Sequence, residues 1–293
     1  MRNSLAALVL AGCLAYHAGP LPGEPAGATF ATVEGARVRY VDVGEGPPVV
    51  LIHGFGASLD SWLTVVPVLA KSHRVLALDL KGFGWSDRPE GDYSPAAEAR
   101  IVLALMSARG IDRAAIVGQS WGGAIALSVV AAAPARVTRV VIYGGLAFED
   151  QVTGFMSWTR VRGLGELMFW LMWDPTLLGE NADRAFYDKS LVTADGLDRI
   201  AAAQRRPGAR AAAYAAVSQI RMTELEQRYR TMTQPFLLLW GREDAIVPRR
   251  FGERLARELP NAKLIVYPRC GHLPQFEAPR STQDLATFLA EDS

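Results

Sequence analysis

Cysteine, histidine and net charge are all scarce in this sequence of 293 residues. It has 2 Cys and 4 His, and 31 Lys and Arg against 30 Asp and Glu leave a formal net charge of +1. Two cysteines cannot form a disulfide framework, and without a CxxC pair or a Cys/His cluster we expect no zinc site. A nucleic-acid surface needs a clear excess of Lys and Arg, so the balanced charge argues against nucleic acid as a partner.

Long hydrophobic runs and low-complexity tracts are also lacking. No apolar run reaches the roughly 20 residues that a helix needs to cross a bilayer. Gly, Pro and Ser form no long tracts, and 50% of the residues are hydrophobic, which excludes a disordered or fibrous chain. The length allows one large α/β domain or two small ones.

The N-terminus has the form of a secretory signal. Arg2 precedes a short apolar run, residues 5–14, in which residues 10–13 read LAGC. This sequence resembles the lipobox of bacterial lipoproteins, which are cut before the cysteine that is then lipidated. We therefore predict a signal peptide over residues 1–12, lipidation of Cys13 and a place in the cell envelope, on a membrane or its periplasmic face. An ordinary signal, or an uncleaved tail on a cytoplasmic protein, is the alternative.

The segment after this signal predicts a tether. Residues 14–28 contain three Pro and three Gly without apolar periodicity, so we expect residues 13–28 to act as a spacer. Loss of residues 1–12 removes Arg2 and leaves 30 basic against 30 acidic residues. Anchoring to a membrane would then depend on the lipid and not on a basic patch.

From residue 29 onward, strand and helix patterns alternate. A hairpin pattern over 29–43 comes first, and short apolar runs bounded by turns then mark buried strands. Strands that alternate with helices predict a mostly parallel sheet with helices on both faces. The predicted strands lie at 49–52, 74–80, 114–118, 137–143, 235–240 and 262–267, and the helices at 58–71, 94–109, 121–133, 249–258 and from 281.

This alternation is interrupted once. From about residue 146 to 233 the sequence shows helical patterns and no strand pattern. We therefore expect one α/β core, formed by residues 29–145 and 234–293, with a helical insertion of residues 146–233.

The strongest chemical signal is GQSWGG at residues 118–123, between a strand pattern and a helix pattern. A nucleophile on such a turn has a strained backbone, and the residues two before and two after it must be small. Gly118 and Gly122 meet this requirement. The turn would lift the Ser120 hydroxyl above the sheet, at a helix N-terminus that favours developing negative charge. A glycine-rich turn without a catalytic role is the alternative.

A serine nucleophile needs a base, which is usually a histidine. His73 stands among charged residues, where we expect it in solvent, and His53 lies in the turn after the first buried strand pattern. His272 follows the last strand pattern and would face Ser120 at the carboxyl edge of a parallel sheet. Asp244, after the preceding strand pattern, is the best candidate for the acid that orients the imidazole.

Together these motifs resemble those of the α/β-hydrolase family, over about residues 29–291. The resemblance implies an α/β-hydrolase fold in which the insertion is a cap that roofs the site and selects substrates. The segments that carry it, besides the serine turn, are HGFG, DLKGFGWSD, GRED and GH, at residues 53–56, 79–87, 241–244 and 271–272.

The resemblance also implies roles for individual residues. The backbone N–H groups of Phe55 and Trp121 would form the oxyanion hole, and His53 would shape that loop. Large apolar residues of the cap, with Trp158, Phe169 and Trp170 as candidates, would wall the substrate pocket. Burial of these residues against the core, or contact with a membrane surface, is the alternative.

The predicted function is that of a serine hydrolase without a metal or organic cofactor. Ser120 would attack a carbonyl carbon, His272 would move the proton, Asp244 would hold His272, and water would release an acyl-enzyme. Serine at the turn argues against relatives that use aspartate there, namely haloalkane dehalogenases and epoxide hydrolases. Glu149 and Asp150 remain alternatives for the acid.

The expected substrate is a small to medium apolar ester. A C–C bond hydrolase of ring-cleavage products is the runner-up, and lactone, thioester and haloperoxidase activities also stay open. A non-catalytic binding protein with the same fold is the alternative from a different class. The sequence leaves the oligomeric state open. We interpret Cys270, which lies near His272, as a small packing residue.

Overall fold

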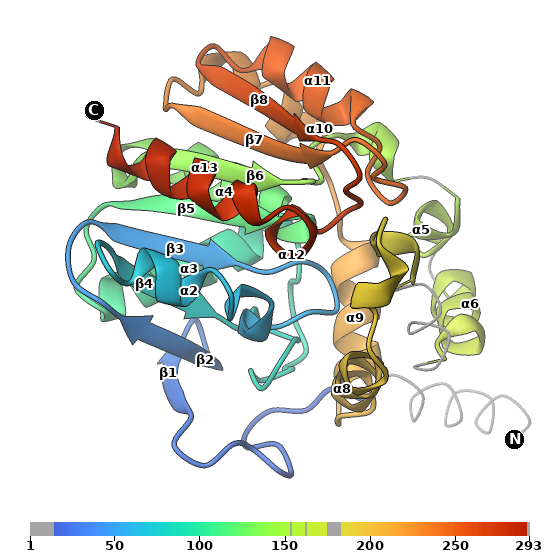
Figure 1. Cartoon of the computed structure of the whole chain (residues 1–293). Coiled ribbons are helices and arrows are strands. Elements are labelled where there is room, and N and C mark those ends of the chain that lie inside the picture. Colours follow the sequence, from blue (N-terminus) through green and yellow to red (C-terminus); the bar gives the residue numbers. More distant parts are fainter. Residues whose placement is uncertain (1–14, 153, 162, 175–182, 292–293) are drawn as a thin grey trace, which may run out of the picture.

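The computed structural model describes residues 15–291, except residues 153, 162 and 175–182. Within these residues eight strands form one sheet in the order β1-β2-β4-β3-β5-β6-β7-β8 (Figure 1). β1 pairs with β2, and β2 with β4, in antiparallel fashion, and the other neighbours are parallel. The strands are β1 (Thr29–Val33), β2 (Ala36–Val43), β3 (Pro48–Ile52), β4 (Arg74–Leu78), β5 (Ala114–Gln119), β6 (Val137–Tyr143), β7 (Phe236–Gly241) and β8 (Ala262–Tyr267).

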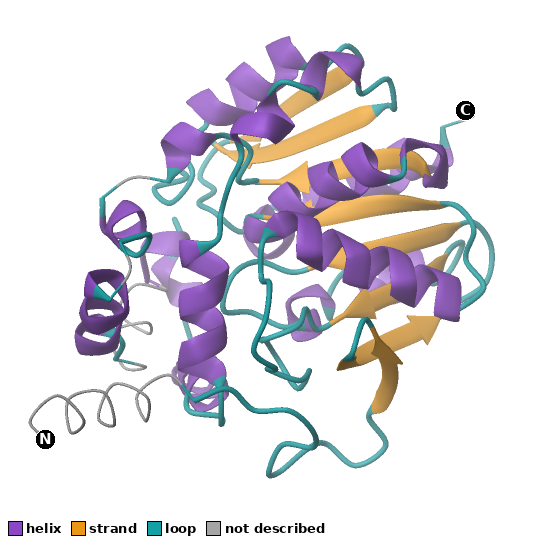
Figure 2. Ribbon diagram, turned by 180° about the vertical axis from the view of Figure 1, so that it is seen from behind, coloured by secondary structure: helices purple, strands orange, loops and turns teal. Residues whose placement is uncertain are grey.

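Alternate side chains of the strands enter two apolar layers on opposite faces of the sheet. Val50 and Ile52 of β3 pack in the layer that holds α3 (Pro95–Ala108), α4 (Trp121–Ala132) and α11 (Arg250–Glu258). Val49 and Leu51 pack in the other, with η1 (Leu59–Trp62), α2 (Val66–Leu69) and α13 (Pro279–Ala290). Helices lie in front of the sheet in Figure 1 and again in the opposite view of Figure 2. The predicted mostly parallel sheet with helices on both faces is confirmed.

One predicted helix is interrupted. In place of a single helix from Ser58 to about Lys71, the structure has η1, which Ser58 caps by accepting from the Asp60 N–H at 3.3 Å, and then α2. Pro67 stands in the first turn of α2. Because proline has no N–H to donate to the preceding turn, it favours a new helix start over continuation.

Helices fill the chain between β6 and β7, and none of its described residues belongs to a strand. In Figure 1 the longer of these helices lie beside the carboxyl ends of the central strands, where the site residues were expected. The described helices of this insertion, long and short, are η3 (Glu149–Gln151), α5 (Phe155–Trp158), α6 (Leu164–Met172), η4 (Lys189–Leu191), α8 (Ala194–Gln204), α9 (Ala209–Ser218), α10 (Thr223–Glu226) and η5 (Tyr229–Thr231). Two short helices complete the core, η2 (Pro134–Arg136) and α12 (Pro274–Glu277).

The described part of the predicted tether packs against the core and is not a free spacer. The His17 N–H donates to the Arg88 carbonyl at 2.8 Å, and Arg88 returns a bond of 2.7 Å to His17. The Gly19 N–H donates to Asp87 at 3.1 Å, and Leu21 is only 3% exposed. The Pro and Gly content did not reveal these contacts because the partners lie some 70 residues away.

The predicted lipobox and Cys13 fall within residues 1–14, which lie outside the described residues, so lipidation stays a prediction. Among the described helices, none combines the length and the apolar character needed to cross a membrane.

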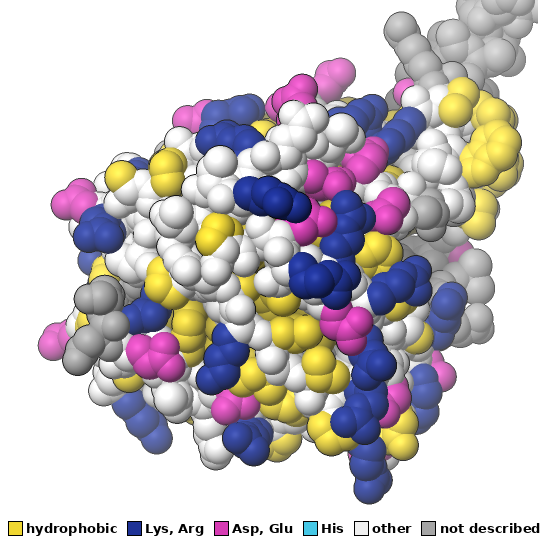
Figure 3. All heavy atoms as spheres, turned by 90° about the horizontal axis from the view of Figure 1, so that it is seen from above, with side chains coloured by type: hydrophobic (Ala, Val, Ile, Leu, Met, Phe, Trp, Pro, Cys, Tyr) yellow, Lys and Arg dark blue, Asp and Glu magenta, His cyan; other side chains and the backbone are white. Residues whose placement is uncertain are grey.

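The surface around α11 has mixed charge. Figure 3 shows basic and acidic side chains interspersed with hydrophobic ones on the face seen from above. On α11 itself, Arg254 forms ion pairs with Asp150 at 3.2 Å and Glu258 at 2.8 Å.

Candidate active site

Ser120 sits on a sharp turn between β5 and α4, with φ of +51°. A positive φ is uncommon for a residue with a side chain, and such strain is found mainly at functional sites. A Cβ atom on Gly118 would lie 2.1 Å from the Gly122 carbonyl oxygen, and one on Gly122 would lie 2.4 Å from that of Ile52. Both positions therefore require glycine, as the sequence motif demands.

His272 and Asp244 form a buried pair. Nδ1 of His272 lies 2.9 Å from Oδ2 of Asp244, and the side chains are 7% and 0% exposed. The other carboxylate oxygen, Oδ1, accepts the N–H groups of Ile246 at 2.9 Å and Val247 at 2.8 Å. A carboxylate only accepts, so Nδ1 carries the proton and Nε2 keeps the lone pair that a general base needs.

Gly144 brings this pair and the serine turn to the same edge of the sheet. It follows β6 with φ of +49°, and a Cβ atom there would lie 3.1 Å from both Oδ2 of Asp244 and Nδ1 of His272. The preceding residue, Tyr143, accepts the Ser120 N–H at 2.9 Å. The sequence analysis assigned no role to Gly144 and therefore missed this contact.

The loop after β3 lies against Ser120. A Cβ atom on Gly54 would be 3.2 Å from Cβ of Ser120 and 2.2 Å from Oε1 of Gln119. Phe55 follows directly and Trp121 begins α4, and both line a cavity together with Ser120. The structure thus brings together the residues expected at an oxyanion hole.

His53 braces this loop. Its fully buried ring accepts the Leu80 N–H on Nε2 at 3.0 Å, and Nδ1 lies 2.7 Å from the Gly54 carbonyl oxygen, to which it donates. Burial lowers the pKa of the imidazole, which favours its neutral form. These contacts agree with the structural role expected of His53.

His73 corrects a prediction, because it is buried and not in solvent. Its Nδ1 lies 2.9 Å from the Ser72 hydroxyl oxygen, and burial lowers the pKa of its imidazole. The charged neighbours in sequence did not indicate that its own side chain faces inward.

The alternative acids are engaged elsewhere. Oε1 of Glu149 pairs with Arg160 at 2.5 Å, and Oε2 accepts the Met222 N–H at 2.7 Å. Asp150 pairs with Arg254 at 3.2 Å. Of the three candidates, Asp244 is the one hydrogen-bonded to His272.

Cys270 is a poor nucleophile in this setting. Its side chain is buried, and burial, with nearby acidic groups, raises the pKa of the thiol to about 12. The thiolate is therefore scarce near neutral pH, in agreement with a packing role.

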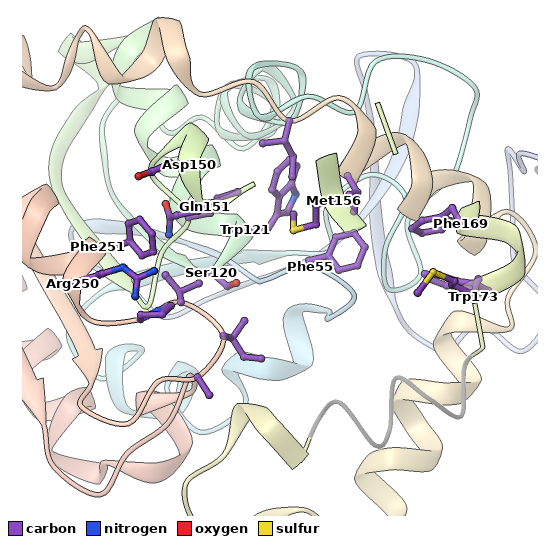
Figure 4. A pocket seen from close by; sticks show the side chains of 18 of the residues that line it. Phe55, Ser120, Trp121, Asp150, Gln151, Met156, Phe169, Trp173, Arg250 and Phe251 are labelled. Carbon is purple, nitrogen blue, oxygen red and sulfur yellow. The ribbon is translucent and has the colours of Figure 1, made fainter. Parts of the chain in front are cut away.

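A cavity of about 630 Å³ opens beside Ser120, between the core and the helical insertion (Figure 4). Most of its wall is apolar, and its charged side chains are Asp150, Asp174 and Arg250. The apolar wall includes Phe55, Trp121, Leu146, Met156, Phe169, Met172, Trp173, Val217, Ile220, Ile246, Val247 and Phe251.

The predicted pocket residues divide into two groups. Phe169 is buried and lines the cavity, as expected. Trp158 and Trp170 are not among the lining residues and are 58% and 36% exposed, and Trp170 lies 5.8 Å below the Arg210 guanidinium. The two tryptophans are exposed because α5 and α6 pack other side chains, Met156 and Phe169, toward α9 (Ala209–Ser218).

The sequence between residues 47 and 279 matches the family model described as alpha/beta hydrolase fold. The chain therefore belongs to the α/β-hydrolase family, and it is a hydrolase of that fold. The predicted fold class is confirmed.

Similar proteins include several hydrolases of dienoates. The 2-hydroxy-6-oxo-2,4-heptadienoate hydrolase of Pseudomonas putida is 33% identical over 276 residues, which cover 88% of this chain and 94% of that protein. The 2-hydroxy-6-oxo-6-phenylhexa-2,4-dienoate hydrolase of Burkholderia cepacia is 31% identical, with 82% and 86% covered. A solved meta-cleavage product hydrolase from Pseudomonas fluorescens IP01 superposes with a TM-score of 0.77 at 30% identity, over 89% and 97% of the two chains.

Proposed function

We propose that this protein hydrolyses the C5–C6 bond of 2-hydroxy-6-oxo-2,4-dienoates, with Ser120, His272 and Asp244 as catalytic residues. The observation that carries the proposal is the 31–33% identity to two dienoate hydrolases along most of the chain. It favours the C–C hydrolase that the sequence analysis ranked second over the ester hydrolase that it ranked first. The largely apolar cavity beside Ser120 suits the substituent on the 6-oxo carbon.

The proposed reaction starts from the 2-oxo tautomer of the substrate. Nε2 of His272 takes the Ser120 proton while Oγ attacks C6, and the N–H groups of Phe55 and Trp121 stabilise the oxyanion that forms. Collapse breaks the C5–C6 bond, its electron pair passes along the conjugated chain to the C2 oxygen, and this oxygen takes the proton that Nε2 of His272 holds. Water then hydrolyses the acyl-enzyme, which gives a carboxylic acid and 2-hydroxy-2,4-pentadienoate.

Arg250 is the candidate partner for the substrate carboxylate. It lines the cavity at the N-terminus of α11, and Figure 4 shows it on the same side of the cavity as Ser120. Of the two acids in the cavity wall, Asp150 pairs with Arg254, which offsets its charge. A guanidinium suits a carboxylate because it can donate two parallel hydrogen bonds.

The proposal is tested by comparing 2-hydroxy-6-oxo-2,4-heptadienoate with p-nitrophenyl esters of graded acyl length. We expect kcat/KM for the dienoate to exceed that for the best ester by about 100-fold or more, because specificity follows transition-state binding. Turnover of esters without turnover of the dienoate would restore the ester hydrolase and overturn the proposal.

The Arg250→Ala variant tests the carboxylate contact. We expect KM for the dienoate to rise by roughly 10-fold or more, since a charge-assisted hydrogen bond is lost, and KM for a neutral ester to stay nearly constant. Arg249→Ala is the matched control, because Arg249 pairs with Glu253 at 3.6 Å and does not line the cavity. An equal KM rise in both variants, or in neither, would remove Arg250 from the substrate contact.

From the LAGC sequence at residues 10–13 we also propose that Cys13 is lipidated and holds the enzyme at a membrane. Intact-mass spectrometry of protein from a bacterial envelope should show the mass of a chain that begins at an acylated Cys13. The Cys13→Ser variant should lack this modification. An unmodified chain that begins at Met1, in a host that processes lipoproteins, would contradict the proposal and favour a cytoplasmic enzyme.

A further inference from the structure

Glu277, the last residue of α12, joins two segments that meet beside His272, the loop after β8 and the insertion between β6 and β7. Its Oε2 accepts the Gly271 N–H at 2.7 Å, immediately before His272. Its Oε1 accepts two N–H groups of the inserted segment, those of Tyr187 at 2.6 Å and Asp188 at 3.0 Å. One carboxylate therefore uses both oxygens to bridge the histidine loop and the cap.

The two segments also touch directly. The His272 N–H donates to the Ala185 carbonyl at 2.6 Å. A Cβ atom on Gly271 would lie 2.4 Å from that same oxygen and 2.9 Å from the Tyr187 nitrogen, so the backbones approach as closely as glycine permits. Residues 185–188 of the cap thus pack directly against the backbone of Gly271 and His272.

We propose that Glu277 is a positioning residue that couples the cap to His272. It fixes the histidine loop against cap residues 185–188, so the position of the His272 imidazole depends on the position of the cap. The inference rests on the proposed role of His272 as general base, and it adds that the cap contributes to catalysis through the loop as well as to the pocket wall.

The two acceptor oxygens of the carboxylate allow a variant that tests the bridge directly. Among the described residues, Glu277 accepts three backbone N–H groups, two on Oε1 and one on Oε2. Glutamine has nearly the same shape but only one acceptor oxygen, and its NH₂ group can only donate. Whichever way the amide of a Glu277→Gln variant turns, one of the two segments loses its acceptor.

Glu243 provides a matched control on the same loop. Its Oε2 accepts the Cys270 N–H at 3.0 Å, one residue before the N–H that Glu277 binds. The carbonyl oxygen of a Glu243→Gln variant can still accept this single bond. The two variants make the same chemical change at adjacent points of the loop, and only the one at Glu277 breaks a bridge.

The test measures steady-state kinetics, the rate of fluorophosphonate labelling and the melting temperature of the full-length variants. For Glu277→Gln we expect kcat and the labelling rate to fall by roughly 10-fold or more, with KM little changed, because a small displacement of a catalytic group is costly. Glu243→Gln should stay within about twofold of wild type in each quantity, as surface changes usually do.

The outcomes separate this inference from the proposed function. Wild-type protein that fluorophosphonate does not label would refute the serine mechanism itself. Wild-type kinetics in Glu277→Gln, or a rise in KM alone, would overturn the coupling, since a cap that is merely loosened affects substrate binding and not the histidine. If Glu277→Gln fails to fold, Glu277→Asp keeps the charge but shortens the reach, and it should show the same loss of kcat.

Discussion

Replacement of Ser120 by alanine, or of His272 by alanine, should lower kcat by roughly a thousandfold or more while the fold stays intact. In the proposed mechanism Ser120 carries the attacking oxygen, and the bond between Nδ1 of His272 and Asp244 leaves Nε2 to accept the serine proton. Since the two act in one step, the double variant should be about as slow as either single variant. Turnover of the dienoate and circular dichroism of each variant provide the measurements.

Ser128→Ala is the matched control for the serine. Ser128 lies on the same helix, α4, and its hydroxyl donates to the Ala124 carbonyl at 2.8 Å, away from the site. We expect this variant to keep nearly full activity. Substantial turnover by Ser120→Ala would mean that the nucleophile lies elsewhere or that the chemistry needs none.

The core could be predicted well because its elements are marked locally. Strand β6 was predicted at residues 137–143 and is found there. Its residues 140–143 form the short unbroken apolar run that is typical of a strand buried on both faces. The serine turn was equally clear, because Gly118 and Gly122 are required by contacts of 2.1 and 2.4 Å that no other residue permits. In both cases the constraint lies within a few residues of the chain.

The pocket could not be predicted to the same level. Helix α6 is apolar on nearly all sides, so its sequence does not tell which side faces the cavity. The structure buries Phe169 and exposes Leu171, two positions away. Only the packing of α6 against α9 separates the inner from the outer residues, and this packing depends on chain segments distant in sequence.

The bridge made by Glu277 was also beyond sequence analysis. Its cap partners are backbone N–H groups, and Tyr187 lies 90 positions away. Every residue type except proline has such a group, so no pattern of side chains marks the contact. Contacts of this kind, between a side chain and a remote backbone, need the fold before they can be found.

Asp244→Asn should lower kcat by roughly 10³- to 10⁴-fold, and the hydrogen bonds around Asp244 explain why. Oδ1 accepts two backbone N–H groups, from Ile246 and Val247, so an asparagine would keep its only oxygen there. Its NH₂ group would then point at Nδ1 of His272, now 2.9 Å from Oδ2. The imidazole would have to accept on Nδ1 and carry its proton on Nε2, which is the wrong tautomer for a base.

The alternative acids supply the comparison. Glu149→Gln and Asp150→Asn make the same type of change, but Glu149 binds Arg160 and the Met222 N–H, and Asp150 binds Arg254 at the surface. We expect each of them to keep kcat within about 10-fold of wild type, because neither is bonded to the histidine. Dienoate turnover across the three variants, with melting temperatures as a check on folding, decides among the acids. Near-normal turnover by Asp244→Asn, together with loss of turnover in Glu149→Gln or Asp150→Asn, would move the acid to the end of β6 and require His272 to change its partner during catalysis.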